Sequence, residues 1–115
     1  MTTESAKVLI SPAFGAGWST WYHGTCLDDI LYDEKLILAV EAGEDLGKED
    51  DPDTPLGDFD ARMKAKHGEG WSMYYGGARD LVVVTVHGPF TVEEYDGSES
   101  IRETEDLRHI PPFMR

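Results

Sequence analysis

Residues 12–24, PAFGAGWSTWYHG, combine glycines with aromatic side chains in a way that could bind a small anionic ligand. The turn around Gly15 and Gly17 follows an apolar run, and backbone N–H groups in such turns can point at a phosphate. Trp18 and Trp21 could supply stacking surfaces for a base. The turn lacks the third glycine of a dinucleotide-binding fingerprint and the lysine of a P-loop. The alternative is that the glycines adopt positive φ angles while the aromatic side chains cap the core.

Carboxylates are concentrated in two other stretches, residues 44–60 and 93–106, with few basic residues among them. Clustered negative charge attracts basic surfaces, although such a run can also be no more than a solvated segment. The first stretch does not fit a calcium-binding EF-hand, because the required glycine and the closing glutamate are out of place. The carboxylates expected to contact a basic partner, with Trp18 and Trp21 as aromatic anchors, are Glu44, Asp45, Glu49, Asp50, Asp51, Asp53, Glu93, Glu94, Asp96 and Glu99.

Catalytic and metal-binding patterns are incomplete in this sequence. Cys26 is the single cysteine, and its position beside Leu27 is typical of a small buried residue rather than of a nucleophile. His23 lies near Cys26, but nothing in the pattern indicates that it activates the thiol. His67 is expected to be an exposed partner of a helix dipole, and the chain lacks a His-x-x-x-His motif, a P-loop and a serine elbow. We therefore predict no enzymatic activity, no metal site and no cofactor.

The 115 residues carry a formal net charge of −13, which limits the partners of this chain. A surface of this charge repels nucleic acid and anionic lipid, so we expect neither as a direct partner. It attracts basic proteins, although strong acidity also serves solubility alone. No apolar stretch approaches the ~20 residues of a membrane helix, and the first residues do not resemble a secretory signal. With a single cysteine, the cytoplasm is the expected compartment.

Apolar periodicity predicts both strands and helices along the chain. Period-2 and continuous β-branched runs indicate strands, and apolar residues spaced three and four apart indicate helices. The β-branched run at 80–87 leaves little polar surface, so both faces of that strand are expected to be covered. The expected strands span 7–11, 80–87, 90–95 and 98–103, and the expected helices span 25–42, with a break near 32–33, and 58–67.

These elements predict a single α+β domain over residues 1–115, with a small, mostly antiparallel sheet of three or four strands and one to three helices packed on one face. The last three strands are expected to form a meander, with the first strand beside 81–86. Residues 44–58 are rich in carboxylates, glycine and proline, and predict a mobile acidic loop. The C-terminal tail is expected to be short and irregular, packing through Ile110 and Phe113.

Three motifs of this chain also occur together in a known group. They are Val8-Leu9-Ile10 with Phe14-Gly15-Ala16-Gly17, Leu36 with Val40-Glu41-Ala42-Gly43, and Glu94-Tyr95-Asp96-Gly97-Ser98-Glu99 with Ile101. On these motifs the chain resembles a family of small, mostly uncharacterised tailed-phage and prophage proteins. The resemblance covers both ends of the chain and the first helix; the middle departs from it, and Gly-Ala-Gly-Trp stands where Gly-Gly-Phe-Gly is expected. It implies a phage accessory protein that acts on host machinery.

We therefore expect a phage-encoded acidic protein that inhibits a host defence complex, as anti-CRISPR proteins do. Its carboxylates would imitate DNA phosphates on a basic nucleic-acid-binding surface in the host cytoplasm. The alternative is a protein that binds or sequesters a nucleotide signal through the glycine-rich aromatic loop, which would require Lys7, Arg62 or Arg79 to converge locally. A homo-oligomeric structural or regulatory subunit is a third possibility.

Overall fold

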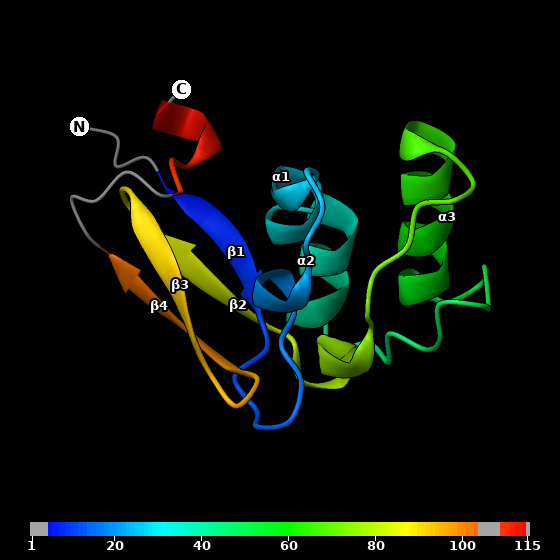
Figure 1. Cartoon of the computed structure of the whole chain (residues 1–115), viewed down its shortest axis with the longest axis horizontal. Coiled ribbons are helices and arrows are strands. Elements are labelled where there is room, and N and C mark those ends of the chain that lie inside the picture. The colour runs from blue at the N-terminus through cyan, green and yellow to red at the C-terminus, as the bar shows by residue number, and fades with distance from the viewer. Residues whose placement is uncertain (1–4, 104–108, 115) are drawn as a thin grey trace.

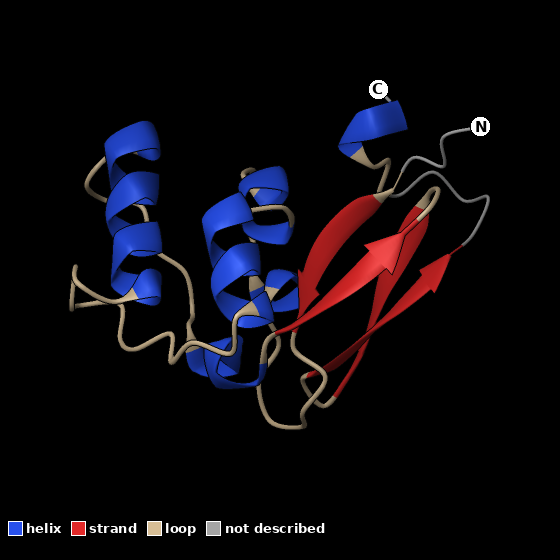
Figure 2. Ribbon diagram, turned by 180° about the vertical axis from the view of Figure 1, so that it is seen from behind, coloured by secondary structure: helices blue, strands red, loops and turns tan. Residues whose placement is uncertain are grey.

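A computed structural model describes residues 5–103 and 109–114 and confirms a small α+β fold. Figure 1 shows the strands gathered on one side of the molecule, with α2 between them and α3. Figure 2 shows the same division from behind. The elements are β1 (Ala6–Ile10), η1 (Ser19–Trp21), α1 (Leu27–Leu31), α2 (Glu34–Glu41), α3 (Pro55–His67), η2 (Gly76–Asp80), β2 (Val82–Val86), β3 (Phe90–Tyr95), β4 (Ser98–Glu103) and η3 (Pro112–Met114), where η denotes a 3₁₀ helix.

The four strands form two antiparallel two-stranded sheets. β1 pairs with β2, which confirms the expected neighbour of the first strand. β3 pairs with β4 around a tight turn at Asp96 and Gly97, whose φ angles of +48° and +85° suit an Asp-Gly turn. The meander prediction is wrong between β2 and β3, which do not pair with each other. At the start of β3, the Phe90 N–H donates to the His109 carbonyl of the tail, and the Phe90 carbonyl accepts from the His109 N–H.

β1 is the strand that is covered on both faces. Because side chains alternate along a strand, Leu9 points into the core cluster shared with the helices, while Val8 and Ile10 point into the cluster between the two sheets. The prediction that both faces of 80–87 are covered holds only in part. Val83 packs against the first cluster and Val84 against the second, but the side chain of Val82 is 39% exposed and Thr85 is also exposed.

The helices follow the sequence pattern closely, including the predicted break. α1 ends at Leu31, and Asp33 then caps α2 by accepting a hydrogen bond from the Leu36 N–H at 2.9 Å. α3 begins three residues earlier than predicted, at Pro55, because a proline suits the first position of a helix. Within the described ranges, no helix is long and apolar enough to cross a membrane.

Candidate functional site

The acidic loop, residues 44–53, follows α2 and is held against the start of α3 by backbone contacts. The Leu56 N–H donates to the Leu46 carbonyl at 2.9 Å. The Thr54 hydroxyl donates to the carbonyls of Lys48 and Asp51 at 3.0 and 2.7 Å, and it accepts from the Gly57 N–H at 3.1 Å. Thr54 therefore caps α3 and fastens the loop with one side chain.

Two aspartates shape the acidic loop further. Asp45 Oδ1 accepts from the Gly47 N–H and Asp51 Oδ1 accepts from the Asp53 N–H, both at 3.0 Å, which are local turns of the kind that aspartate favours. The Asp51 carbonyl lies so close to Gly57 that an added Cβ would stand 1.7 Å from it. These contacts define the path of the loop in this structure. Residues 55–58, which the expected mobile loop included, belong to α3.

The carboxylates of the acidic loop are exposed and carry uncompensated charge. None of them is in an ion pair with any residue that the structure describes. The helices differ, since their carboxylates at Asp29, Asp33, Asp58 and Asp60 each lie within 2.9 Å of a basic nitrogen. Like charges without counter-charges raise the local negative potential. The exposed set is Glu44, Asp45, Glu49, Asp50, Asp51 and Asp53, all candidates predicted from the sequence.

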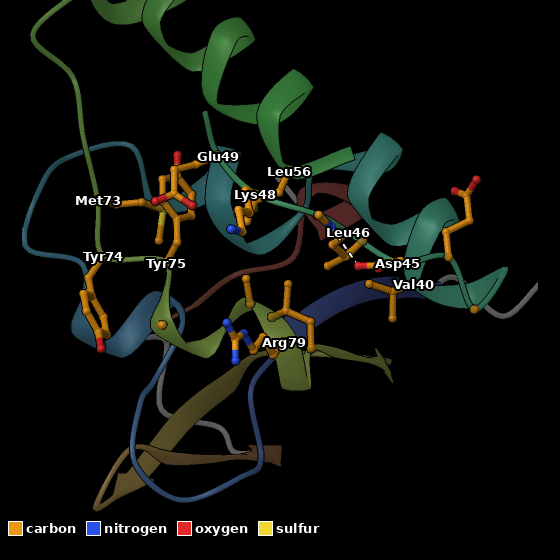
Figure 3. Close-up of a pocket in the computed structure, with 16 residues that line it drawn as sticks. Val40, Asp45, Leu46, Lys48, Glu49, Leu56, Met73, Tyr74, Tyr75 and Arg79 are labelled. Carbon is orange, nitrogen blue, oxygen red and sulfur yellow. Dashed lines mark hydrogen bonds between the residues drawn. The ribbon is translucent and has the colours of Figure 1, made fainter. Parts of the chain in front are cut away.

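A groove of about 880 Å³ runs beside the acidic loop, which forms one of its walls (Figure 3). The opposite wall comes from residues 73–79, at η2 and the segment before it. That wall is tied to α3 because the Tyr75 hydroxyl donates to Asp60 at 2.6 Å. Burial, and secondly this hydrogen bond, raise the pKa of the Tyr75 phenol, so it stays protonated as a donor. The apolar lining comes from Val40, Leu46, Leu56, Met73, Ala78 and Leu81.

Two basic side chains, Lys48 and Arg79, also line the groove. In Figure 3 they reach toward the same space, Lys48 from the acidic loop and Arg79 from η2. Neither forms an ion pair among the described residues, although the chain is rich in carboxylates. The groove thus offers an apolar lining, an acidic rim and two free donors, a mixture that is typical of sites that bind a polypeptide segment.

The second acidic stretch is used largely inside the molecule. Glu99 is 1% exposed, and its carboxylate accepts hydrogen bonds from the backbone N–H groups of Ser11, Trp18 and Thr20 at 2.8–2.9 Å. The Thr20 hydroxyl adds a further bond. An anion held by several backbone N–H groups is what the glycine-rich turn was predicted to bind, but here the anion is a side chain of β4. The prediction that Glu99 contacts a partner is therefore wrong.

The neighbouring carboxylates of the β3–β4 hairpin also have partners within the chain. Glu94 Oε1 accepts from the Gly97 N–H at 2.6 Å and from the Trp21 indole at 3.3 Å. Glu93 lies 3.6 Å from an Arg102 nitrogen. Asp96, exposed at the turn, remains the predicted residue of this stretch whose side chain has no described partner. In Figure 1, the η2 segment lies between the turn of this hairpin and the acidic loop.

Trp18 and Trp21 do not act as the exposed anchors predicted from the sequence. Trp18 is fully buried, and its indole N–H donates to the Ile30 carbonyl at 3.0 Å. Its ring packs against Phe59, with the ring centroids 5.8 Å apart. The prediction that it contacts a partner or a ligand is wrong, because its large apolar surface is used in the core. Trp21 is half-buried and packs on Tyr74 near the groove, with the two ring centroids 5.6 Å apart.

The glycine-rich turn is occupied by the protein itself. The Gly15 N–H donates to the Asp96 carbonyl at 2.7 Å, and the donors that follow Gly17 serve Glu99. Of the cations that were required to converge, Lys7 pairs with Glu41 and Arg62 with Asp33. The turn geometry therefore gives the ligand-binding alternative no support. The other interpretation fits better, since Gly15 has a φ of +109° and Trp18 fills the core.

Sequence reasoning missed several residues that the fold brings to notice. Phe14 and Tyr95 are each 72% exposed, and their rings pack edge to face with centroids 6.4 Å apart. These two residues, rather than the two tryptophans, are the prominent aromatic side chains at the surface. The groove residues come from two separate segments of the chain, within 40–56 and 73–81, which left no local motif. The sulfur of Cys26 and a ring nitrogen of His67 also lie within 4.8 Å of each other.

Comparison of the chain with protein-family models, with curated proteins and with solved structures finds no match.

Proposed function

We propose that this protein acts by occupancy, binding a basic surface of a partner protein with its acidic loop while the adjacent groove takes an apolar side chain. One observation carries the proposal. Six exposed carboxylates lie within ten residues, without ion-pair partners among the described residues, on a loop whose path is held by hydrogen bonds. Such charges accelerate encounter with a basic partner, and a preformed loop loses little conformational entropy on binding.

The groove contributes what charge alone does not supply. An aliphatic or aromatic side chain of the partner would lie among Leu46, Met73 and Leu81, excluding water from the centre of the contact. Lys48 and Arg79 are placed to donate to main-chain carbonyls of the same segment, and the rim carboxylates to accept from its lysines or arginines. The partner site is therefore a basic segment with one apolar residue that protrudes from it.

The finer proposal is that the partner belongs to a host defence complex and that binding blocks its nucleic-acid-binding surface. The net charge of −13 and the resemblance to tailed-phage proteins support this proposal. Because the acidic charge of the β3–β4 hairpin is largely used internally, imitation of DNA would be confined to the acidic loop. A short basic segment of the complex is a better match than a long nucleic-acid channel.

The proposal is tested by affinity capture from a bacterial host lysate, followed by mass spectrometry of the retained proteins. The loop variant carries Glu44→Gln, Glu49→Gln, Asp50→Asn and Asp53→Asn, which remove charge without removing a described side-chain hydrogen bond. The matched control carries Glu34→Gln, Asp80→Asn, Glu93→Gln and Asp96→Asn, the same change in net charge at exposed positions outside the acidic loop.

We expect the loop variant to lose affinity for the captured protein by at least about tenfold, and the control to change little, because the effect is local. Binding of the original chain should weaken steeply from low to moderate salt. Purified target should then release its nucleic acid when this protein is added. Equal losses in both variants, or a flat response to salt, would remove the proposal.

A further inference from the structure

Cys26, Asp29 and His67 bring three metal-ligating side chains together where α1 begins and α3 ends. One sulfur, one carboxylate oxygen and one ring nitrogen all lie within 4.8 Å of one another. Cys26 immediately precedes α1 and Asp29 lies in its first turn, whereas His67 is the last residue of α3. The cluster therefore joins segments about forty residues apart, and no spacing rule in the sequence could have indicated it.

Asp29 divides its two oxygens between different neighbours. Oδ1 lies 2.9 Å from the Lys66 ammonium, and Oδ2 lies 2.8 Å from His67 Nε2. Burial alone would raise the pKa of the Asp29 carboxyl, but the hydrogen bonds from Lys66 and His67 outweigh it and lower this pKa below its ordinary value. One oxygen of the carboxylate is thus held by Lys66, and the other lies beside the His67 imidazole.

The thiol is positioned by the core rather than left on a flexible loop. Cys26 is half-buried and packs against the core cluster shared by the helices and the β1–β2 sheet. The backbone N–H of Cys26 donates to the Tyr22 hydroxyl at 3.2 Å. The Tyr22 ring in turn packs on Trp71, with the ring centroids 6.1 Å apart. A metal ligand supported in this way loses little freedom on coordination.

We propose that Cys26, Asp29 and His67 form a binding site for zinc. A thiolate, an imidazole and a carboxylate are the three ligand types that zinc combines, whereas magnesium and calcium prefer oxygen alone. Three protein ligands leave a fourth tetrahedral position for water. Lys66 donates to Oδ1 of Asp29 and would act as an outer-shell partner that orients this ligand.

The site would bridge α1 and α3, which Asp29 already joins through its contacts with Lys66 and His67. Zinc that bridges the residue before α1 and the last residue of α3 binds the folded chain and not the unfolded one, so it raises the unfolding temperature by mass action. Coordination needs a deprotonated thiol and a neutral imidazole. Affinity for zinc should therefore increase as pH rises.

The test titrates the full, untagged chain with Co²⁺ as a spectroscopic substitute and then displaces it with Zn²⁺. Because Cys26 is the single cysteine, a sulfur-to-cobalt charge-transfer band reports this site and not the exposed carboxylates. We expect one equivalent of metal, a tetrahedral visible spectrum and loss of both signals on addition of zinc. Absence of the charge-transfer band at saturating cobalt would overturn the proposal.

The variants are Cys26→Ser, His67→Gln and Asp29→Asn, with His87→Gln as the matched control because His87 is exposed and outside the cluster. Each site variant should lose zinc affinity by at least about tenfold, because the loss of an outer-shell partner alone typically lowers metal affinity by about that factor. The control should bind as the original chain does. Circular dichroism and the unfolding temperature without metal verify that each variant folds. A folded His67→Gln chain with unchanged affinity would also overturn the site.

Discussion

The two acidic stretches have similar composition but are used in different ways. In the acidic loop, backbone hydrogen bonds, the Thr54 hydroxyl and local turns at Asp45 and Asp51 hold the path of the chain. The carboxylates of residues such as Glu49 and Asp50 therefore remain free at the surface. In the β3–β4 hairpin the carboxylates themselves are the acceptors, with Glu99 serving the donors of the glycine-rich turn and Glu94 those of the hairpin. The difference teaches that clustered carboxylates stay exposed where other groups satisfy the backbone donors nearby.

The strongest test of this comparison replaces Glu99 with Gln. The amide keeps the shape but removes the charge and presents an NH₂ group toward backbone donors, so the free energy of unfolding should fall by about 3 kcal/mol. The control is Glu49→Gln in the acidic loop, which should change stability by no more than about 0.5 kcal/mol. Urea denaturation measures both variants. Equal effects would mean that the two stretches do not differ in the way described.

A second test loosens the acidic loop without changing its charge. Thr54→Ala removes the cap of α3 and both hydroxyl bonds to the loop, so it should cost about 1–2 kcal/mol of stability. Amide hydrogen exchange of residues 44–53 should become faster while β1 remains protected. Thr25→Ala, at an exposed position with no described side-chain bond, is the control. Unchanged exchange in the Thr54 variant would show that the loop is held by other contacts.

A third test concerns the paired carboxylates on the helices, represented by Asp29. Since the pKa of Asp29 is lowered in the folded chain, its contribution is present above the unfolded pKa and is lost as pH falls through the folded value. The stability difference between the original chain and Asp29→Asn should therefore shrink from pH 5 toward pH 2, by up to about 1 kcal/mol for a surface group. Denaturation with chelator present, so that no metal contributes, measures it. A difference independent of pH would contradict the assignment.

The smallest effect is expected from the loop variant that neutralises Glu44, Glu49, Asp50 and Asp53. No described ion pair is lost and like-charge repulsion is relieved, so stability should stay within about 0.5 kcal/mol of the original chain or rise slightly. Thermal unfolding at low salt is the most sensitive measurement, because salt screens such repulsion. A clear loss of stability would show that these charges have partners inside the fold.

The local elements of this fold were predictable because their signals are local. The break between α1 and α2 could be read from Asp33, whose side chain caps the following helix, and the β3–β4 turn from Asp96 and Gly97. Which strands share a sheet was less predictable. The β2–β3 connection looked like a hairpin, but Phe90 pairs with a residue nineteen positions later, and no short-range pattern encodes that choice.

Composition and spacing alone determined that this chain is a small acidic α+β protein with a capped helix pair, an Asp-Gly hairpin and six carboxylates before its longest helix. Only the tertiary structure decided which of its charges face outward, that Trp18 fills the core, and that Cys26 meets His67. The reason is physical. Propensity and capping act within a few residues, whereas burial of Glu99 and assembly of the groove depend on segments that approach only when the chain has folded.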